Sequence, residues 1–182
     1  MRAPLDVMSD GSERVRYNRP GFAVFAYRTH LSDYPEGRIL CHWHDDLEFC
    51  FVRKGRIRCE VGGDVFTLCE GEGLFINSDQ PHGMDSFSGE DCEYFCMVLH
   101  PALLGTSAYL LENFVRPLAN NEAFSCLKLT SSEGWQQMVL QFEDYIRYGD
   151  EMDPAYVQKW HAQGLDKQVM GRNDFYHRWA LF

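Results

Sequence analysis

Three side chains that can bind a metal ion lie close together in one short stretch of the sequence. His42, His44 and Glu48 are separated by even numbers of residues. Alternate residues of a strand share a face, so an unbroken strand would direct these three side chains into one space. A fourth donor, His82, follows a predicted turn. Three imidazoles and one carboxylate are a donor set typical of divalent transition metals, so we expect iron, manganese, zinc or nickel.

These four residues, named the histidine–glutamate cluster below, allow three interpretations. They hold a metal ion, they hydrogen-bond a polar ligand without metal, or they form a structural polar network. A buried, ionised Glu48 costs several kcal/mol unless a cation, a protonated histidine, ligand hydroxyls or water compensates it. Trp43 could stack on a sugar ligand, although such an aromatic more often packs against a neighbouring element. Asp45 and Asp46 are more typical of a solvated turn.

Short β-like runs recur between residues 22 and 100, at roughly 8–12-residue spacing. The expected strands are residues 22–29, 48–53, 56–61, 65–69, 74–77 and 94–99. The third and fourth of these form a predicted hairpin around the Gly-rich turn 62–64. Many short strands joined by tight turns predict a closed barrel or a sandwich.

The hydrophobic period becomes helical after residue 100. We expect a helix over residues 107–118 that packs on the barrel, and a strand over 124–129. The segment Thr130–Glu133 has the capping-box pattern of a helix start. An apolar face from Trp135 to Ile146 follows it, and this face could form a dimer interface. A further short helix is expected after Pro154.

The spacing of the candidate ligands resembles the first motif of the cupin superfamily, written G-x5-H-x-H-x3/4-E-x6-G. The corresponding residues are Gly37, His42, His44, Glu48 and Gly55, with the first spacing one residue short. The second cupin motif, G-x5-P-x-G-x2-H, corresponds to Gly71, Asn77, Asp79 and His82. Asn77 and Asp79 stand where the family has proline and glycine. The resemblance spans residues 22–100 and implies a jelly-roll β-barrel with all four metal-ligand positions occupied.

A narrower resemblance is to the N-terminal sensor domain of AraC-type transcription regulators. It is carried by the run from His42 to Glu48, by residues 71–77, by Pro81-His82 and by the helices after His100-Pro101. In that family the barrel binds a small sugar or metabolite, the following helices dimerise, and a C-terminal helix-turn-helix region binds DNA. The resemblance implies a cytoplasmic, dimerising, ligand-sensing domain. Residues 164–182 do not resemble the DNA-binding region.

Charge and cysteine content exclude several classes. The chain has 17 Lys and Arg against 27 Asp and Glu, a net charge of −10, and no cation between Arg58 and Arg116. Nucleic-acid surfaces need clustered cations, so we expect no nucleic acid bound by this chain alone. Seven cysteines without a C-x-x-C pair argue against a disulfide framework or a zinc finger. Cys50, Cys59 and Cys69 lie in strand-like runs and are expected to be small buried apolar side chains, whereas alternation would direct Cys41 away from the histidines. No apolar run approaches the roughly 18 residues of a membrane helix.

We therefore expect a mainly β protein in four parts. These are a flexible arm (1–20), a cupin β-barrel (21–104), a helical extension for dimerisation or packing (105–163) and a tail (164–182). The first hypothesis is a small-molecule sensor of an AraC-type regulator whose ligand-binding residues are His42, Trp43, His44, Glu48 and His82. The alternative is a metal-dependent cupin enzyme, a dioxygenase or isomerase, although no separate general acid or base is visible. A non-functional remnant of a regulator is the third hypothesis.

Overall fold

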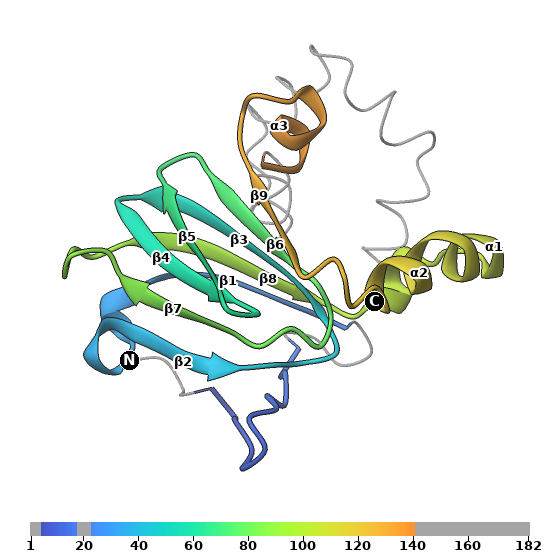
Figure 1. Ribbon diagram of the computed structural model, residues 1–182, viewed down its shortest axis with the longest axis horizontal. Coiled ribbons are helices and arrows are strands. Elements are labelled where there is room, and N and C mark those ends of the chain that lie inside the picture. Colours follow the sequence, from blue (N-terminus) through green and yellow to red (C-terminus); the bar gives the residue numbers. More distant parts are fainter. Residues whose placement is uncertain (1–4, 18–22, 141–182) are drawn as a thin grey trace, which may run out of the picture. The chain divides into compact units, whose positions relative to one another are not determined.

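The computed structural model describes residues 5–17 and 23–140, and most of them form two antiparallel β-sheets (Figure 1). The five-stranded sheet has the order β1-β8-β3-β6-β9. Its strands are β1 (Val24–His30), β8 (Glu93–Leu99), β3 (Leu47–Lys54), β6 (Gly73–Ile76) and β9 (Cys126–Leu129). The four-stranded sheet has the order β2-β7-β4-β5. Its strands are β2 (Arg38–His42), β7 (His82–Ser86), β4 (Arg56–Val61) and β5 (Asp64–Cys69).

Side chains from both sheets meet in one apolar core. Cys50, Leu74 and Tyr94 come from the five-stranded sheet, and Ile57 and Leu68 come from the four-stranded sheet; all five are fully buried. This arrangement is the mainly β jelly roll that the strand pattern and the cupin resemblance predicted. The six predicted strands and the hairpin of β4 and β5 are confirmed within one or two residues.

Two strands, β2 and β7, were not predicted, and they change how the cluster is assembled. His42 is the last residue of β2, whereas Glu48 lies in β3 of the other sheet. The prediction of one unbroken strand from His42 to Glu48 is therefore wrong, because the chain turns between the sheets at residues 43–46. The shared direction of these side chains comes from two sheets facing one interior.

A β-bulge in β2 turns His42 inward. Ile39 pairs with Met84 and His42 pairs with His82, so three steps on β2 match two steps on β7. The extra residue leaves Leu40 and Cys41 both exposed, as expected when a bulge breaks the alternation of faces. Gly83 makes room for the bulge, since a Cβ there would lie 3.0 Å from the carbonyl oxygen of Ile39.

The cysteines are free, and most are buried, as predicted for small apolar side chains. Cys50 and Cys59 are fully buried in the core. Cys69 was also expected to be buried, but it is exposed because it is the last residue of the edge strand β5. Cys41 points away from the histidines, as predicted.

A helical segment covers residues 108–119. It comprises α1 (Ala108–Leu110), the π-helical turn η4 (Leu111–Val115) and α2 (Arg116–Ala119), and Ser107 Oγ caps it by accepting the Leu110 N–H. The prediction that its apolar face packs on the barrel is wrong, since Tyr109 and Phe114 are exposed. The π turn adds a residue and breaks the 3.6-residue period of that prediction.

Three short 3-10 helices complete the described elements: η1 (Leu31–Asp33), η2 (Pro35–Gly37) and η3 (Pro101–Leu104). The predicted second helix begins later than expected, as α3 (Gly134–Leu140). The Thr130–Glu133 segment is a turn before it, and Gln136 Oε1 accepts the Thr130 N–H in place of Glu133.

Several predictions fall outside the described residues. These are the apolar helix face beyond residue 140, the helix after Pro154, the tail 164–182, and the ends of the arm at residues 1–4 and 18–20. Across 5–17 and 23–140, none of the helices has the length and apolar character of a membrane span.

Candidate functional site

The structure brings together all four residues of the histidine–glutamate cluster. His42 ends β2, His44 lies in the connection to β3, Glu48 lies in β3 and His82 begins β7. One donor atom from each residue lies within 4.8 Å of the donor atoms of the other three. Each residue is at most 4% exposed. The cluster thus occupies the interior of the barrel, where the two sheets converge.

Backbone carbonyl groups fix the orientation of the three imidazoles. The Nδ1 atoms of His42, His44 and His82 lie 2.9, 3.1 and 2.8 Å from the carbonyl oxygens of Leu40, Asp46 and Gln80. A carbonyl oxygen only accepts hydrogen bonds, so each Nδ1 carries the proton. The Nε2 atom of each ring is therefore the one directed at the cluster, as a metal ligand requires.

Glu48 lies at the centre of the cluster. Its Oε2 atom lies 3.2 Å from the Nε2 atoms of both His44 and His82, and its Oε1 accepts the Cys96 thiol at 3.4 Å. Because Nδ1 of each ring already donates, a hydrogen bond from Nε2 to Glu48 requires a second proton and hence an imidazolium ion. The carboxylate therefore needs positive charge around it, which either protons or a metal ion can supply.

The pKa values reflect this charge balance. Burial alone would raise the pKa of Glu48, but His82 and His44 outweigh it and hold the pKa well below its usual range. Burial also opposes the charge of His44, yet contact with Glu48 raises the pKa of that imidazole overall. Burial, followed by the charge of His82, lowers the pKa of His42 to about 4. His42 thus stays neutral more readily than His44.

The described part of the N-terminal arm docks beside the cluster. The backbone of Trp43 exchanges hydrogen bonds with Gly11 and Glu13, and its indole N–H donates to the carbonyl of Asp10 at 3.3 Å. Glu13 Oε2 lies 3.5 Å from Nε2 of His42. The flexible arm expected from the sequence is therefore held in place over residues 5–17. Trp43 packs against a neighbouring element, the more frequent arrangement for an aromatic there.

Asp46 departs from the solvated turn that the sequence predicted. It is 1% exposed, and the Tyr17 hydroxyl of the arm donates to both of its carboxylate oxygens, at 2.9 and 3.0 Å. Burial raises the pKa of Asp46. Asp45 beside it is exposed, as expected. The contacts of Glu13 and Tyr17 were missed because nothing in the sequence of the arm indicates where it docks.

These observations fit a metal ion. The four donors converge, the inward nitrogens are unprotonated in neutral imidazole, and the ligating rings are oriented by carbonyl oxygens. Nitrogen and carboxylate donors suit a divalent transition metal, which would act as a Lewis acid or hold a bound ligand. The cluster could therefore hold a metal ion, and its donor set does not distinguish among iron, manganese, zinc and nickel.

Comparison with known proteins agrees with the fold. Residues 30–98 match the family model described as a cupin domain. This range contains the whole histidine–glutamate cluster, strands β2 to β7, and all of β8 except its last residue. Residues 30–98 of the chain are therefore similar to a cupin domain.

The chain is also related to a curated regulator. It is 30% identical over 117 residues to the uncharacterized HTH-type transcriptional regulator YdeC of Bacillus subtilis, covering 64% of this chain and 40% of that protein. The chain thus spans well under half the length of this relative.

Two solved cupin structures are each similar to less than half of the chain. An RmlC-like cupin from Shewanella frigidimarina is 15% identical with a TM-score of 0.38, covering 43% of this chain and 67% of that one. A cupin protein from Bacteroides fragilis is 20% identical with a TM-score of 0.38, covering 43% and 66%.

Proposed function

We propose that this chain is the ligand-sensing cupin domain of a cytoplasmic AraC-type transcription regulator. The observation that carries the proposal is the buried histidine–glutamate cluster in a cupin domain related to an HTH-type regulator. The effector, a small sugar or metabolite, binds inside the barrel at this cluster, directly or through a bound metal ion.

The docked arm supports a sensing role. Glu13 faces His42, and Tyr17 binds Asp46, two residues after His44. A change in the charge or position of these cluster residues alters the contacts that hold residues 5–17. Effector binding can therefore change the arm, and with it any DNA-binding region attached to the chain.

Dimerisation through the helical extension is part of this proposal. Tyr109, Phe114, Trp135 and Met138 are each more than half exposed. Exposed large apolar side chains gathered on helices are typical of protein interfaces. Light scattering over micromolar concentrations tests this part, and a protein that stays monomeric at high micromolar concentration contradicts it.

Elemental analysis tests the metal. Protein purified without added metal, and again after reconstitution, is compared with a His42→Ala/His44→Ala variant and with a His30→Ala control. His30 is exposed and pairs with Asp91 on the surface. Near-stoichiometric metal in wild type and control, lost in the double variant, supports the site. No metal in any sample leaves a metal-free polar effector pocket, which a screen of sugars and metabolites for thermal stabilisation then tests.

A metal-dependent cupin enzyme is the second candidate. It is favoured by the three convergent imidazole nitrogens, because a divalent metal on four protein ligands keeps positions for substrate. Among the described residues, we identify no general acid or base in the barrel interior besides the cluster itself. Turnover of a candidate substrate that is lost in the His42→Ala/His44→Ala variant would favour the enzyme over the sensor.

A further inference from the structure

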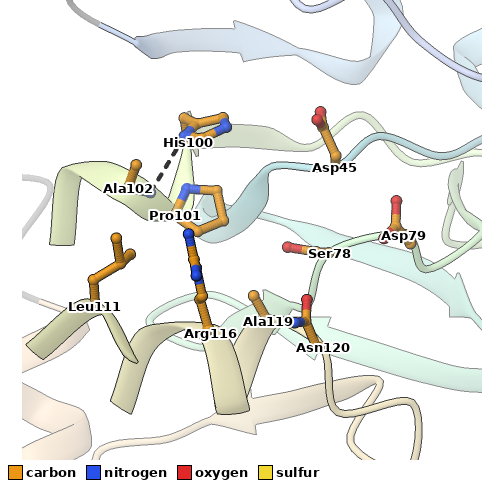
Figure 2. Close-up of a pocket in the computed structure, with 10 residues that line it drawn as sticks. All are labelled: Asp45, Ser78, Asp79, His100, Pro101, Ala102, Leu111, Arg116, Ala119 and Asn120. Atoms are coloured by element: carbon orange, nitrogen blue, oxygen red, sulfur yellow. Dashed lines mark hydrogen bonds between the residues drawn. The ribbon is translucent and has the colours of Figure 1, made fainter. Parts of the chain in front are cut away.

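A second hollow lies at the end of the sandwich, outside the barrel interior (Figure 2). It has a volume of about 230 Å³. Its walls are the connection from β2 to β3, the loop from β6 to β7, the start of η3, and residues 111–120 of the helical segment. We call it the end pocket. None of the four cluster residues lines it, so it is separate from the site in the barrel.

The end pocket has opposite charges on its two sides. Asp45 and Asp79 lie on the side of the loops, and Arg116 rises from α2 on the other side (Figure 2). Arg116 pairs with Glu112 at 2.7 Å, but both side chains are more than half exposed. An exposed ion pair of this kind contributes little, so the guanidinium remains able to bind a ligand carboxylate.

A buried hydroxyl is directed into the same space. Ser78 is 5% exposed, and its Oγ atom has no hydrogen-bond partner within the described part of the chain. Its side chain extends toward the interior of the pocket in Figure 2. Buried hydroxyls are nearly always satisfied, so this atom indicates a missing partner on the pocket side. The amide of Asn120 adds a further polar group to the helical wall.

The backbone of Asp79 has a conformation that glycine adopts more readily than other residues. Its φ is 60°, in the left-handed region that favours glycine. The cupin motif has glycine at this position, as noted above from the sequence. Asp79 therefore brings a carboxylate to the pocket from a backbone conformation that glycine adopts more readily than aspartate.

We propose that the end pocket binds a small zwitterion of the α-amino-acid type. The ammonium group lies against the carboxylates of Asp45 and Asp79. The ligand carboxylate lies against Arg116, with the hydroxyl of Ser78 and the amide of Asn120 as further hydrogen-bond partners. A volume of about 230 Å³ suits such a small molecule. A simple anion would leave two carboxylates facing it, and a simple amine would leave the guanidinium without a partner.

The position of the end pocket links the barrel to the helices. The Asp79 N–H donates to the carbonyl of the cluster residue His44 at 2.8 Å. Arg116 and Asn120 belong to the helical segment. A ligand that contacts both sides therefore joins the loop that holds His44 to the helices proposed to dimerise. The site does not need a metal, so its test is independent of the metal in the barrel.

The test uses the full chain in EDTA and the twenty protein amino acids as probes. Thermal shift identifies the amino acid that stabilises the protein most, and ¹H–¹⁵N spectra locate its binding. We expect saturable binding that perturbs the amides of Asp79 and Asn120. The amine lacking the carboxylate and the acid lacking the amine bind at least about tenfold more weakly than the parent amino acid.

Two variants and two matched controls locate the site. Asp79→Asn and Arg116→Gln each weaken binding about tenfold or more. Asp64→Asn and Arg58→Gln, at positions outside the pocket, leave binding unchanged. The proposal is overturned if no amino acid stabilises the protein. The proposal is also overturned if both pocket variants bind the amino acid as tightly as wild type does. Binding of the amine alone or the acid alone as tightly as the parent amino acid overturns it as well.

Discussion

The histidine–glutamate cluster and the end pocket are neighbouring polar sites with opposite construction. The cluster is buried, and carbonyl oxygens and a central carboxylate hold its imidazoles. The lining of the end pocket includes three exposed charged residues and one buried hydroxyl. Mutual contacts already satisfy much of the cluster, whereas the groups of the end pocket lack a common partner. The first site is therefore part of the stability of the fold, and the second is suited to reversible binding.

The two departures from the second cupin motif lie on the side of the end pocket. Asn77 replaces the proline of the motif, and its Nδ2 donates to the carbonyls of Leu118 and Phe124 at 2.8 and 2.9 Å. Its backbone N–H also donates to the carbonyl of Ser125. A proline could make none of these three hydrogen bonds. Asn77 thus ties the helical segment to the barrel, and Asp79 supplies charge to the pocket between them.

The largest expected effect is at the centre of the cluster. Glu48→Gln removes the buried charge that His44 and His82 surround, and breaking a buried ion pair typically costs about 3 kcal/mol or more. Urea unfolding of the metal-free protein in EDTA measures this loss. Glu60→Gln is the control, because Glu60 is exposed and lies 3.8 Å from Arg58; we expect a change of less than about 0.5 kcal/mol. Similar losses in the two variants would contradict the structural role of the cluster.

The link between barrel and helices gives the next effect. Asn77→Ala removes both side-chain hydrogen bonds and leaves two carbonyl groups unpaired, so we expect a loss of about 2 kcal/mol. Hydrogen exchange should show the loss of protection concentrated at residues 118–126. The matched control is Asn113→Ala, because the exposed Asn113 donates its side-chain hydrogen bond to Tyr109 of the same helical segment. Uniform loss of protection over all nine strands would show that Asn77 supports the whole barrel instead.

The sequence predicted which residues form the cluster more completely than which strands carry them. The identities and spacing of His42, His44, Glu48 and His82 were enough to name the donors, because cupin-like motifs place them at recognisable intervals. The division between β2 and β3 was missed, since a bulge at Leu40 and Cys41 leaves no hydrophobic signature. The segments 38–42 and 82–86 also lack the alternation of apolar and polar residues that indicates strands.

The end pocket could not be predicted from the sequence by the same reasoning. Its residues come from four segments spread from Asp45 to Asn120, with no repeated spacing. The helical wall depends on a π turn at Leu111–Val115 that periodicity does not indicate. The docked position of the arm depends on tertiary contacts of Glu13 and Tyr17. Only the departure at Asp79 from the cupin motif gave a signal, and the left-handed backbone was needed to interpret it.

The titration of His42 gives the third prediction. Its pKa is about 4 in the folded protein and 6.5 when unperturbed, so between these values the unfolded chain binds the proton first. Stability from this residue is therefore present above pH 6.5 and falls as the pH decreases toward 4. At pH 5 the loss relative to pH 7 is about 2 kcal/mol. The difference in unfolding free energy between wild type and His42→Gln in EDTA should shrink by that amount, and a constant difference would contradict the low pKa.

The smallest expected effect is that of Asp79→Gly. It distinguishes the end pocket from the histidine–glutamate cluster most clearly, because stability rises while ligand binding at the end pocket weakens. Asp79→Gly removes a side chain from a left-handed residue, and glycine adopts φ near 60° without strain. Two effects limit the gain in stability: aspartate tolerates this region better than most residues, and glycine raises the conformational entropy of the unfolded chain. The net gain in the free energy of unfolding is therefore about 0.5 kcal/mol. We expect a small rise in Tm together with weaker amino-acid binding at the end pocket. Asp79→Asn should lose binding without this rise, since asparagine also tolerates the left-handed region. If Asp79→Gly instead lowers Tm, the carboxylate stabilises the loop that carries His44, and its placement against the backbone preference has a structural cause.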